Sequence, residues 1–251
     1  QYSDDIVMQG QLRDKAQKSL EYLVSLVNDI LDMNKLQSGD LKDHQLTFDF
    51  IDFIREINRI YYDKAAEKNI KYDVDWDKVN FKHSILIGNP VYLGRALSNI
   101  ASNAVKFSLS GSTITVWGHE EPIDDKHVLY TLYCKDEGEG MTDEFIKHAF
   151  DMFSQQNQTS RTKYEGSGLG LAISKKLIER MGGSIKFESK KGVGTTAIIK
   201  IPFELGNMDI IGNIDYENVP TKGVHALLVD DNELNIEIAK FFLEDNGMEV
   251  T

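Results

Sequence analysis

The stretch NIASNAVKF, residues 99–107, predicts a helix with two chemically different faces. On a helix, Asn99, Asn103 and Lys106 occupy positions i, i+4 and i+7 and therefore share one face. The apolar stripe of the same helix, expected from Val91 to about Leu109, consists of Leu93, Leu97, Ile100 and Ala104. An amide oxygen is a suitable ligand for Mg²⁺, and a lysine one turn on can meet phosphate as a point charge. The polar face is therefore either an ordinary solvated surface or a magnesium–phosphate site.

A second stretch, EGSGLGLAI (residues 165–173), predicts an anion-binding helix start. Glycines at 166, 168 and 170 lead into a helix expected over Ser167–Met181, so free backbone N–H groups and the positive end of the helix face a ligand. The stretch is not a Walker loop, because it lacks Gly-Lys-Ser/Thr. It also lacks the dinucleotide fingerprint, because position 171 is leucine.

Three further stretches join this set. In DEGEG (136–140), Asp136 can accept a hydrogen bond from an amino group, and Gly138 and Gly140 let the backbone turn closely beneath a ligand, although a plain turn explains the same residues. GVGT (192–195) predicts a hairpin turn. The polar segment SQQNQTSRTKYE (154–165) predicts a mobile lid, with the rings of Phe150 and Phe153 as its anchors.

Composition limits the possible partners and compartments. The chain has 251 residues and a formal charge of −12, which argues against nucleic acid as the main partner. The single cysteine, Cys134, excludes an internal disulfide and fits a reducing compartment. With no long apolar run and no secretory leader, we expect a cytoplasmic segment without direct membrane insertion, whose parent protein can still be membrane-anchored.

The order of elements predicts an α+β fold. Strand and helix patterns alternate over residues 46–205 and predict a two-layer sandwich, with helices on one face of a mixed, largely antiparallel sheet. Before it, residues 1–41 read as a polar turn and then a helix over about 14–38, whose apolar stripe needs a partner helix. Residues 206–222 read as a linker. Residues 223–251 read as the start of a doubly wound α/β fold, with a buried strand, Asp230 and Asp231, a helix and a second strand.

The joint order of these motifs resembles the ATP-binding (Bergerat-type) domain of sensor histidine kinases over residues 46–205. Residues 14–38 resemble the second helix of that family's dimerisation hairpin, and residues 223–251 resemble the start of a receiver domain. The resemblance implies a hybrid sensor kinase of a two-component phosphorelay, with ATP and Mg²⁺ as cofactors. It also implies a homodimer through the hairpin and a receiver domain or response regulator as partner.

The resemblance also implies roles for individual residues. Asn103 binds Mg²⁺ through the ATP phosphates, Asn99 supports it, Lys106 touches phosphate, and Asp136 holds the adenine amino group. Asp230 and Asp231 form an incomplete receiver metal site. The remaining residues of the implied ATP site are Gly138, Gly140, Met141, Phe153, Arg161, Lys163, Gly166, Ser167, Gly168, Leu169, Gly170, Leu171 and Thr195.

The resemblance also distinguishes hydrolysis of ATP by water from phosphoryl transfer to a protein histidine. Related ATPases that hydrolyse ATP (gyrase, the heat-shock chaperone and the mismatch-repair ATPase) carry glutamate at the position of Asn99, and an amide cannot deprotonate water. The six histidines, at 44, 83, 119, 127, 148 and 225, all lack the acidic, arginine-proline context of a phosphoacceptor. We therefore expect the phosphoacceptor histidine upstream of Gln1 and the receiver's phosphoacceptor aspartate beyond Thr251. A water-using ATPase and a non-catalytic docking module stay as alternatives.

Overall fold

The computed structural model describes residues 6–38, 45–156, 167–207, 223–229 and 233–251. They belong to two compact units, residues 1–207 and residues 208–251. The assignment of these units to dimerisation, catalytic, linker and receiver segments stays a prediction.

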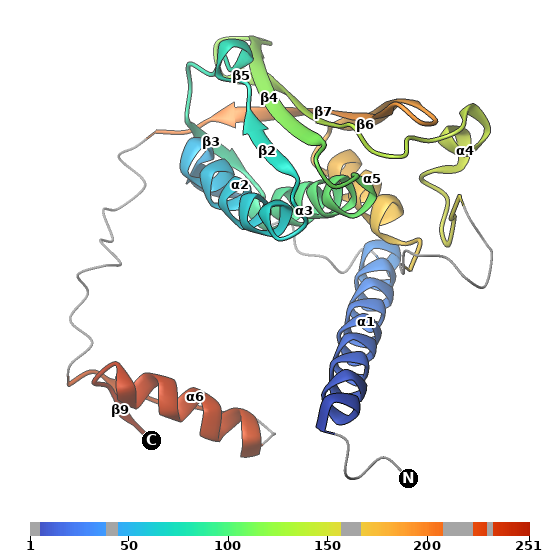
Figure 1. The fold of residues 1–251 in the computed structure, drawn as a ribbon. Helices are drawn as coiled ribbons and strands as arrows, with labels where there is room; N and C mark the ends of the chain where they lie inside the picture. Colours follow the sequence, from blue (N-terminus) through green and yellow to red (C-terminus); the bar gives the residue numbers. More distant parts are fainter. Residues whose placement is uncertain (1–5, 39–44, 157–166, 208–222, 230–232) are drawn as a thin grey trace. The chain divides into compact units, whose positions relative to one another are not determined.

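The first unit is built on a mixed seven-stranded sheet (Figure 1). Its strands are β1 (Leu46–Asp49), β2 (Lys71–Val74), β3 (Ile85–Gly88), β4 (Thr113–Pro122), β5 (His127–Asp136), β6 (Ser184–Lys190) and β7 (Gly194–Leu205). Their order is β1-β3-β7-β5-β4-β2, and β6 pairs with β7. The β2–β4 pair is parallel and the other pairs in this sheet are antiparallel.

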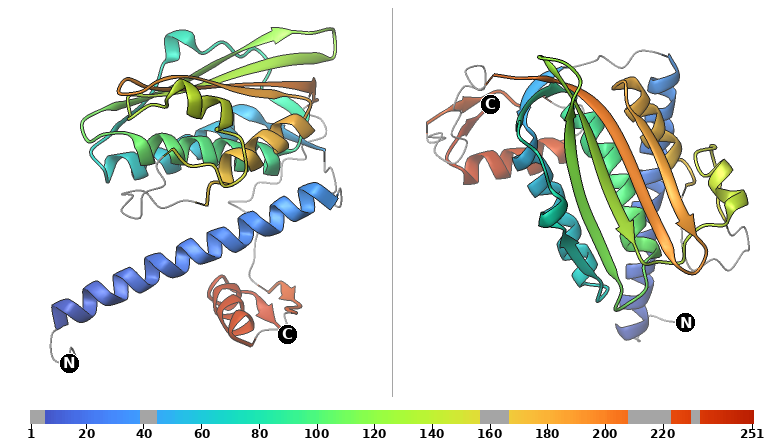
Figure 2. Two further views of the ribbon diagram at one scale, coloured as in Figure 1. Left: turned by 90° about the vertical axis from the view of Figure 1, so that its right-hand side faces the viewer. Right: turned by 90° about the horizontal axis from the view of Figure 1, so that it is seen from above.

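Helices cover one face of this sheet (Figures 1 and 2). They are α2 (Phe50–Ala66), α3 (Pro90–Phe107) and α5 (Gly170–Arg180); a short helix α4 (Asp143–His148) and a 3₁₀ turn η1 (Trp76–Lys78) lie in connections. The core lies between the two layers. Its fully buried side chains include Phe50, Leu93 and Ile178 from the helices and Tyr130 and Ile201 from the strands. Burying each such side chain contributes about 1.5–3 kcal/mol. The predicted two-layer α+β sandwich is confirmed.

Side-chain hydrogen bonds cap the N-termini of three of these helices. Asp49 accepts from the backbone N–H groups of Ile51 and Asp52, and Asn89 accepts from that of Tyr92 at 3.0 Å, just before Pro90. Thr142 does the same for α4. Helix α5 differs, because its first flanking residue is Leu169, which offers no side-chain acceptor.

Helix α1 (Ile6–Ser38) begins earlier than the sequence predicted. The polar turn expected before residue 14 is helical, because exposed polar residues are compatible with a helix. The predicted apolar stripe is exposed at Leu20, Leu23, Val24, Val27, Ile30 and Leu31, which are 42–62% accessible. Nearer its end, α1 buries Met33 against Tyr92 of α3 and Ile173 of α5.

Two other predictions need correction. Residues 85–88 form β3, which pairs with β1 and β7 and was not predicted. Helix α5 begins at Gly170 and not at Ser167, because Gly168 adopts a positive φ of 71° that a right-handed helix excludes.

The second unit contains β8 (His225–Ala226), α6 (Glu233–Asp245) and β9 (Glu249–Val250), with β8 parallel to β9. The helix and its stop before Gly247 agree with the pattern, but the expected buried strand is wrong. Strand β8 has two residues, and Leu227 and Val229 are 79% and 81% exposed. A parallel strand is buried on both faces only between neighbours that cover it. Asp230 and Asp231 lie outside the described residues.

Candidate functional site

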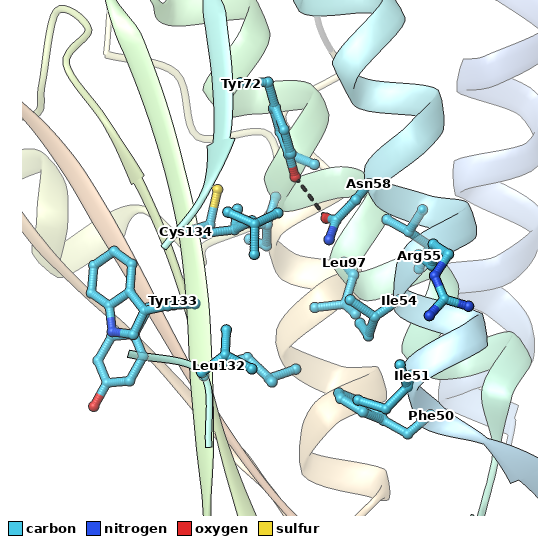
Figure 3. Close-up of a pocket in the computed structure, with 18 of the residues that line it drawn as sticks. Phe50, Ile51, Ile54, Arg55, Asn58, Tyr72, Leu97, Leu132, Tyr133 and Cys134 are labelled. Carbon is cyan, nitrogen blue, oxygen red and sulfur yellow. Dashed lines mark hydrogen bonds between the residues drawn. The ribbon is translucent and has the colours of Figure 1, made fainter. Parts of the chain in front are cut away.

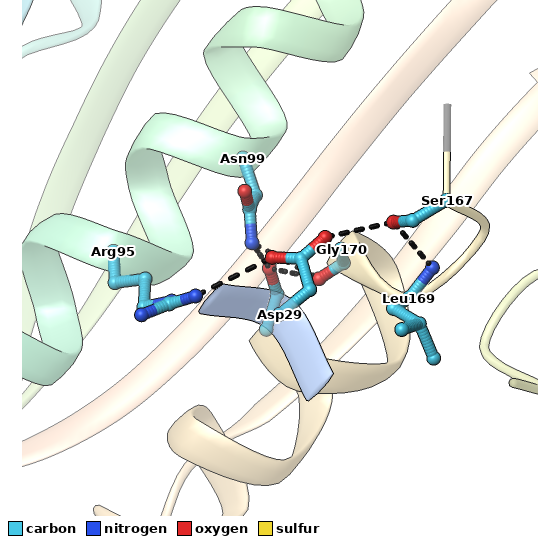
Figure 4. A network of polar contacts seen from close by, with 7 residues as sticks. Asp29, Arg95, Asn99, Ser167, Leu169 and Gly170 are labelled. Atoms are coloured by element: carbon cyan, nitrogen blue, oxygen red, sulfur yellow. Dashed lines mark hydrogen bonds and ion pairs between the residues drawn. The ribbon is translucent and has the colours of Figure 1, made fainter. Parts of the chain in front are cut away.

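The polar face of α3 contacts the start of α5. The side-chain Nδ2 of Asn99 donates to the carbonyl oxygen of Gly170 at 3.1 Å and to Oγ of Ser174 at 3.2 Å (Figure 4). Asn99 therefore holds the first turn of α5 in place, and its Oδ1 is the end of the amide left to accept. The structure thus brings together the two stretches that the sequence singled out separately.

Asn103 and Lys106 continue this face of α3. Asn103 is half-buried, and within the described part of the chain its amide has no hydrogen-bond partner. The Nζ of Lys106 lies 5.0 Å from the ring centroid of Phe107. Both side chains belong to the last two turns of α3, beyond the contact of Asn99 with α5.

The segment before α5 is held by a glycine and a serine. Gly168 has φ of +71°, and a Cβ there would lie 2.7 Å from the carbonyl carbon of Phe153. The Ser167 Oγ accepts from the N–H of Leu169 at 3.1 Å. With no side-chain cap at Leu169 and no acidic residue in its first turn, α5 presents its N–H groups and its positive end to whatever lies beside them.

A carboxylate of α1 lies at this segment (Figure 4). Ser167 Oγ donates to Oδ2 of Asp29 at 2.7 Å, and Oδ1 of Asp29 lies 3.3 Å from Nη2 of Arg95. The Asp29 side chain is only 14% exposed. Neither Asp29 nor Arg95 was predicted as a site residue, because residues 29 and 167 lie 138 positions apart and no local pattern joins them.

The other end of the site is the turn after β5. Asp136 is 8% exposed, and its Oδ1 accepts from the N–H groups of Gly138 at 2.9 Å and Thr195 at 3.2 Å. Its Oδ2 has no partner among the described residues. Burial raises the pKa of Asp136, and the two backbone hydrogen bonds oppose that rise.

Glycines in this turn allow main chain to pack on main chain. A Cβ at Gly138 would lie 2.4 Å from the Phe107 oxygen, and one at Gly140 would lie 2.0 Å from the Lys190 oxygen. At Gly194, in the predicted hairpin, a Cβ would lie 2.1 Å from the Asp136 oxygen. On the side where a Cβ would stand, these glycines therefore pack against protein backbone, and their predicted place beneath a ligand stays a prediction. Nearby, the Met141 N–H donates to Ser189 Oγ at 2.8 Å.

Helix α3 joins the two ends of the site. The Glu139 N–H donates to the Phe107 oxygen at 3.2 Å, so the turn contacts the C-terminal end of α3, while Asn99 contacts α5. Residues 99 and 107 are about 12 Å apart along a helix at 1.5 Å per residue. Asn103 and Lys106 lie between these two contacts on α3. A single extended ligand that reached both ends of the site would pass them.

The segment predicted as a lid is only partly described. Phe150 stacks on Phe187 with ring centroids 4.9 Å apart, and its role as an anchor of the lid stays a prediction. Phe153 is 63% exposed, and its backbone N–H donates to the Gly168 oxygen at 3.0 Å; its role as an anchor stays a prediction. Arg161, Lys163 and Gly166 lie outside the described residues. Leu171, in the first turn of α5, packs against the main core.

The described residues hold neither a metal-binding cluster nor a membrane-spanning helix. No group of three or more histidine, cysteine, aspartate or glutamate side chains there is arranged to hold a metal ion. No helix among them has the length and hydropathy needed to cross a membrane.

Comparison with known proteins identifies the domain. Residues 88–205 match the family described as "Histidine kinase-, DNA gyrase B-, and HSP90-like ATPase". This part of the chain therefore belongs to that ATPase family. The chain as a whole is homologous to hybrid sensor histidine kinases, which confirms the resemblance drawn from the motifs.

Two relatives show the extent of this homology. The chain is 30% identical to the autoinducer 2 sensor kinase/phosphatase LuxQ of Vibrio vulnificus (strain YJ016), over 92% of this chain and 27% of that protein. It is 30% identical to the sensor histidine kinase GacS of Pseudomonas protegens, over 94% of this chain and 25% of that protein. The chain thus spans about a quarter of the length of these relatives.

A solved structure shows the same fold. The crystal structure of full-length ShkA in complex with AMPPNP matches with a TM-score of 0.64 at 22% identity. The match covers 97% of this chain and 48% of that one.

Proposed function

We propose that residues 46–205 bind Mg-ATP and transfer its γ-phosphoryl group to a histidine, as the catalytic core of a sensor histidine kinase. One observation carries most of the argument: the Ser167 hydroxyl beside the uncapped start of α5 already holds a carboxylate, that of Asp29, at 2.7 Å. Donors that bind one anionic oxygen suit the oxygens of a phosphate. Homology to sensor kinases supports the same conclusion.

The residues fit a nucleotide that lies along α3. Asp136 would accept from the adenine amino group through Oδ2, while Gly138 and Thr195 hold Oδ1. At the other end, Ser167 and the N–H groups that follow would receive phosphate oxygens. Between them, the Asn103 amide oxygen would help hold Mg²⁺ and Lys106 would contact phosphate. When bound, Mg²⁺ would neutralise charge on the phosphates.

The chemistry of position 99 favours transfer to a protein nucleophile. A general base for water needs a carboxylate or imidazole near the phosphate, and Asn99 instead donates both its amide hydrogen bonds to α5. The residues described here therefore position ATP and its charge without activating water. Phosphoryl transfer then depends on orientation and charge neutralisation, with the histidine supplied by another segment.

The partners follow from the same proposal. The exposed stripe of α1 would pair in a homodimeric helical bundle, and residues 223–251 would belong to a receiver domain that accepts phosphate in a relay. We propose a cytoplasmic location for this segment. Asp230 and Asp231 would form part of the receiver's metal site.

The first test is calorimetric titration of the chain with Mg-ATP. We expect saturable binding that Asn103→Asp weakens by about tenfold or more, since a carboxylate repels phosphate more than it helps one divalent ion. Asn80→Asp adds the same charge at an exposed residue outside the proposed nucleotide site and is the matched control. Absent binding by the wild-type chain would instead support a docking module.

The second test separates kinase from hydrolase. Mg-ATP is incubated with the chain and with a separately prepared helical hairpin that carries the family's phosphoacceptor histidine. We expect acid-labile phosphate on the hairpin and little free phosphate when the hairpin is omitted. Steady phosphate release without any acceptor would indicate a water-using ATPase and would overturn the proposed reaction.

A further inference from the structure

A cavity of about 420 Å³ lies between α2 and the β2–β4–β5 edge of the sheet, on the side of α3 that faces away from α5 (Figure 3). Leu97, Ile100 and Ala101 of α3 form one wall, and Leu132 and Cys134 of β5 form another. Its volume is in the range of small-molecule sites. Walls of this kind offer enclosed water few hydrogen-bond partners, so an apolar group would replace that water favourably.

The charged groups that line the cavity, with two further polar side chains, come from a single face of α2. Arg55, Asn58, Arg59 and Tyr62 follow one another at i, i+3, i+4 and i+7, and all four line it. Of the described residues that line the cavity, the charged ones are both arginines, and no aspartate or glutamate is among them. In a chain with a formal charge of −12, this is a local cationic rim around an apolar interior.

The donors on this rim are only partly engaged. The Tyr72 hydroxyl donates to Oδ1 of Asn58 at 3.0 Å across the cavity wall, and within the described chain the Asn58 Nδ2 has no partner. Arg55 pairs with Asp52. Arg59 is exposed and pairs with none of the described residues. An anionic oxygen at the rim would therefore meet a guanidinium and an amide N–H without breaking an existing ion pair.

The depth of the cavity favours an apolar body below that head group. Ile100, Ala101 and Leu132 are each at most 8% exposed. Cys134 is half-buried at the wall, and burial together with the nearby Asp136 raises the pKa of its thiol to about 12, so it presents an uncharged surface. Charged tails would be desolvated here without compensation.

We propose that this cavity binds an amphipathic organic acid, with its apolar chain between α2 and the sheet and its carboxylate at Arg59 and Asn58. The occupant that fits this chemistry is a medium-chain fatty acid or a molecule of similar shape. The site is separate from the nucleotide residues, and the proposal does not rest on ATP binding.

The chain provides its own reporter for this site. Of its two tryptophans, Trp76 lines the cavity and is 74% exposed, whereas the Trp117 ring stacks on Tyr133 at the other face of the sheet (Figure 3). Decanoate, below its micellar concentration, is titrated against the full chain while intrinsic fluorescence is recorded. We expect a saturable change with decanoate, a weaker one with decanol, and almost none with decyltrimethylammonium, because the rim is cationic. Absence of saturable binding by decanoate would overturn the proposal.

Two kinds of variant test where the acid binds. Arg59→Gln should weaken decanoate binding by about threefold or more and leave decanol binding unchanged. Lys64→Gln, which removes the same charge from an exposed position of α2 that does not line the cavity, is the matched control and should bind decanoate normally. Equal affinities for decanoate in the two variants would contradict the assigned head-group site.

Val116→Phe fills the cavity from β4 and should abolish binding of both decanoate and decanol. Its thermal unfolding is measured alongside, and only a folded variant is scored. A folded Val116→Phe variant that binds decanoate as the wild type does would contradict the assigned cavity. If this variant does not fold, the comparison of Arg59→Gln with Lys64→Gln still decides the question.

Discussion

Helices α3 and α5 lie side by side on one face of the sheet but begin in opposite ways. Helix α3 begins at Pro90, and the buried Asn89 side chain caps it by accepting from the N–H of Tyr92. Helix α5 begins after a glycine at positive φ, with Leu169 offering no side-chain acceptor. The first arrangement stabilises the protein's own fold, whereas the second leaves hydrogen-bonding capacity for an anion. A helix start without a cap is therefore a better sign of a site than glycine content alone.

The largest expected effect comes from closing the start of α5. In Gly168→Ala, a Cβ would lie 2.7 Å from the Phe153 carbonyl carbon at a strained positive φ, so the segment must move. We expect at least about a tenfold loss of Mg-ATP affinity by calorimetry. Gly111→Ala has a comparable φ of +86° with nothing within 4 Å, and is the matched control. Equal affinity in the two variants would refute the assignment of this helix start to phosphate.

At the other end of the site we expect a smaller effect on Mg-ATP affinity, together with an effect on thermal stability. Asp136→Asn keeps an Oδ1 that can accept from Gly138 and Thr195, but replaces Oδ2 by a donor. We expect Mg-ATP binding to fall by about tenfold through loss of a charged acceptor. The melting temperature at neutral pH should rise.

The sign of the stability change follows from the pKa. Because folding raises the pKa of Asp136, its protonated form favours the fold at low pH, and this contribution is lost as the pH rises through the raised pKa. The stability advantage of Asp136→Asn should therefore be small in acid and grow toward neutral pH. Thermal unfolding at several pH values measures this stability advantage. An advantage of Asp136→Asn that shrinks with rising pH would contradict the prediction.

Opening the start of α3 should affect stability and not binding. Asn89→Ala removes the acceptor for the Tyr92 N–H at a buried position, which should cost about 1 kcal/mol of unfolding free energy. Denaturant titration measures the loss. Mg-ATP affinity of the folded variant should match the wild type. A large loss of affinity would show that the two helix starts are not functionally distinct.

The smallest expected effect comes from removing the Asp29 carboxylate, which accepts from Ser167 just before α5. Asp29→Ala frees the Ser167 hydroxyl and removes a negative charge, so Mg-ATP should bind about threefold more tightly. Asn34→Ala, at an exposed position of the same helix, should not change the affinity. Weaker binding in Asp29→Ala would mean that Asp29 supports the site instead of competing for it.

The sequence predicted the parts of the fold that rest on local patterns. The apolar stripe of α3 and the glycines before α5 have fixed periods or backbone requirements, so their interpretation did not need tertiary information. Strand β3 escaped prediction because four residues ending at Gly88 run directly into the Asn89-Pro90 helix start and show too little alternation. The early start of α1 escaped it because polar residues suit an exposed helix and a turn equally.

The unpredicted parts of the site depend on contacts between distant segments. Within the sequence of its own helix, Asp29 is an ordinary polar residue. Only its contacts with Ser167 and Arg95 place it at the candidate site. The site role of Gly138 and Gly140 stays a prediction, and their close neighbours are main-chain oxygens of residues 107 and 190, which no local pattern indicates. The cavity under α2 is a packing gap, and packing gaps leave no periodic signal.

The interlocked main chain at Gly138, Gly140 and Gly194 bears on chemical inhibition of this domain. Under the proposed function, a competitive inhibitor seated against that turn would rest on peptide groups whose positions are fixed by approaches that exclude any side chain. Point mutations could not easily reshape such a wall, since each glycine replacement would break the turn itself. Drug resistance by substitution at these three positions should therefore be rare, and it should carry a loss of folding wherever it arises.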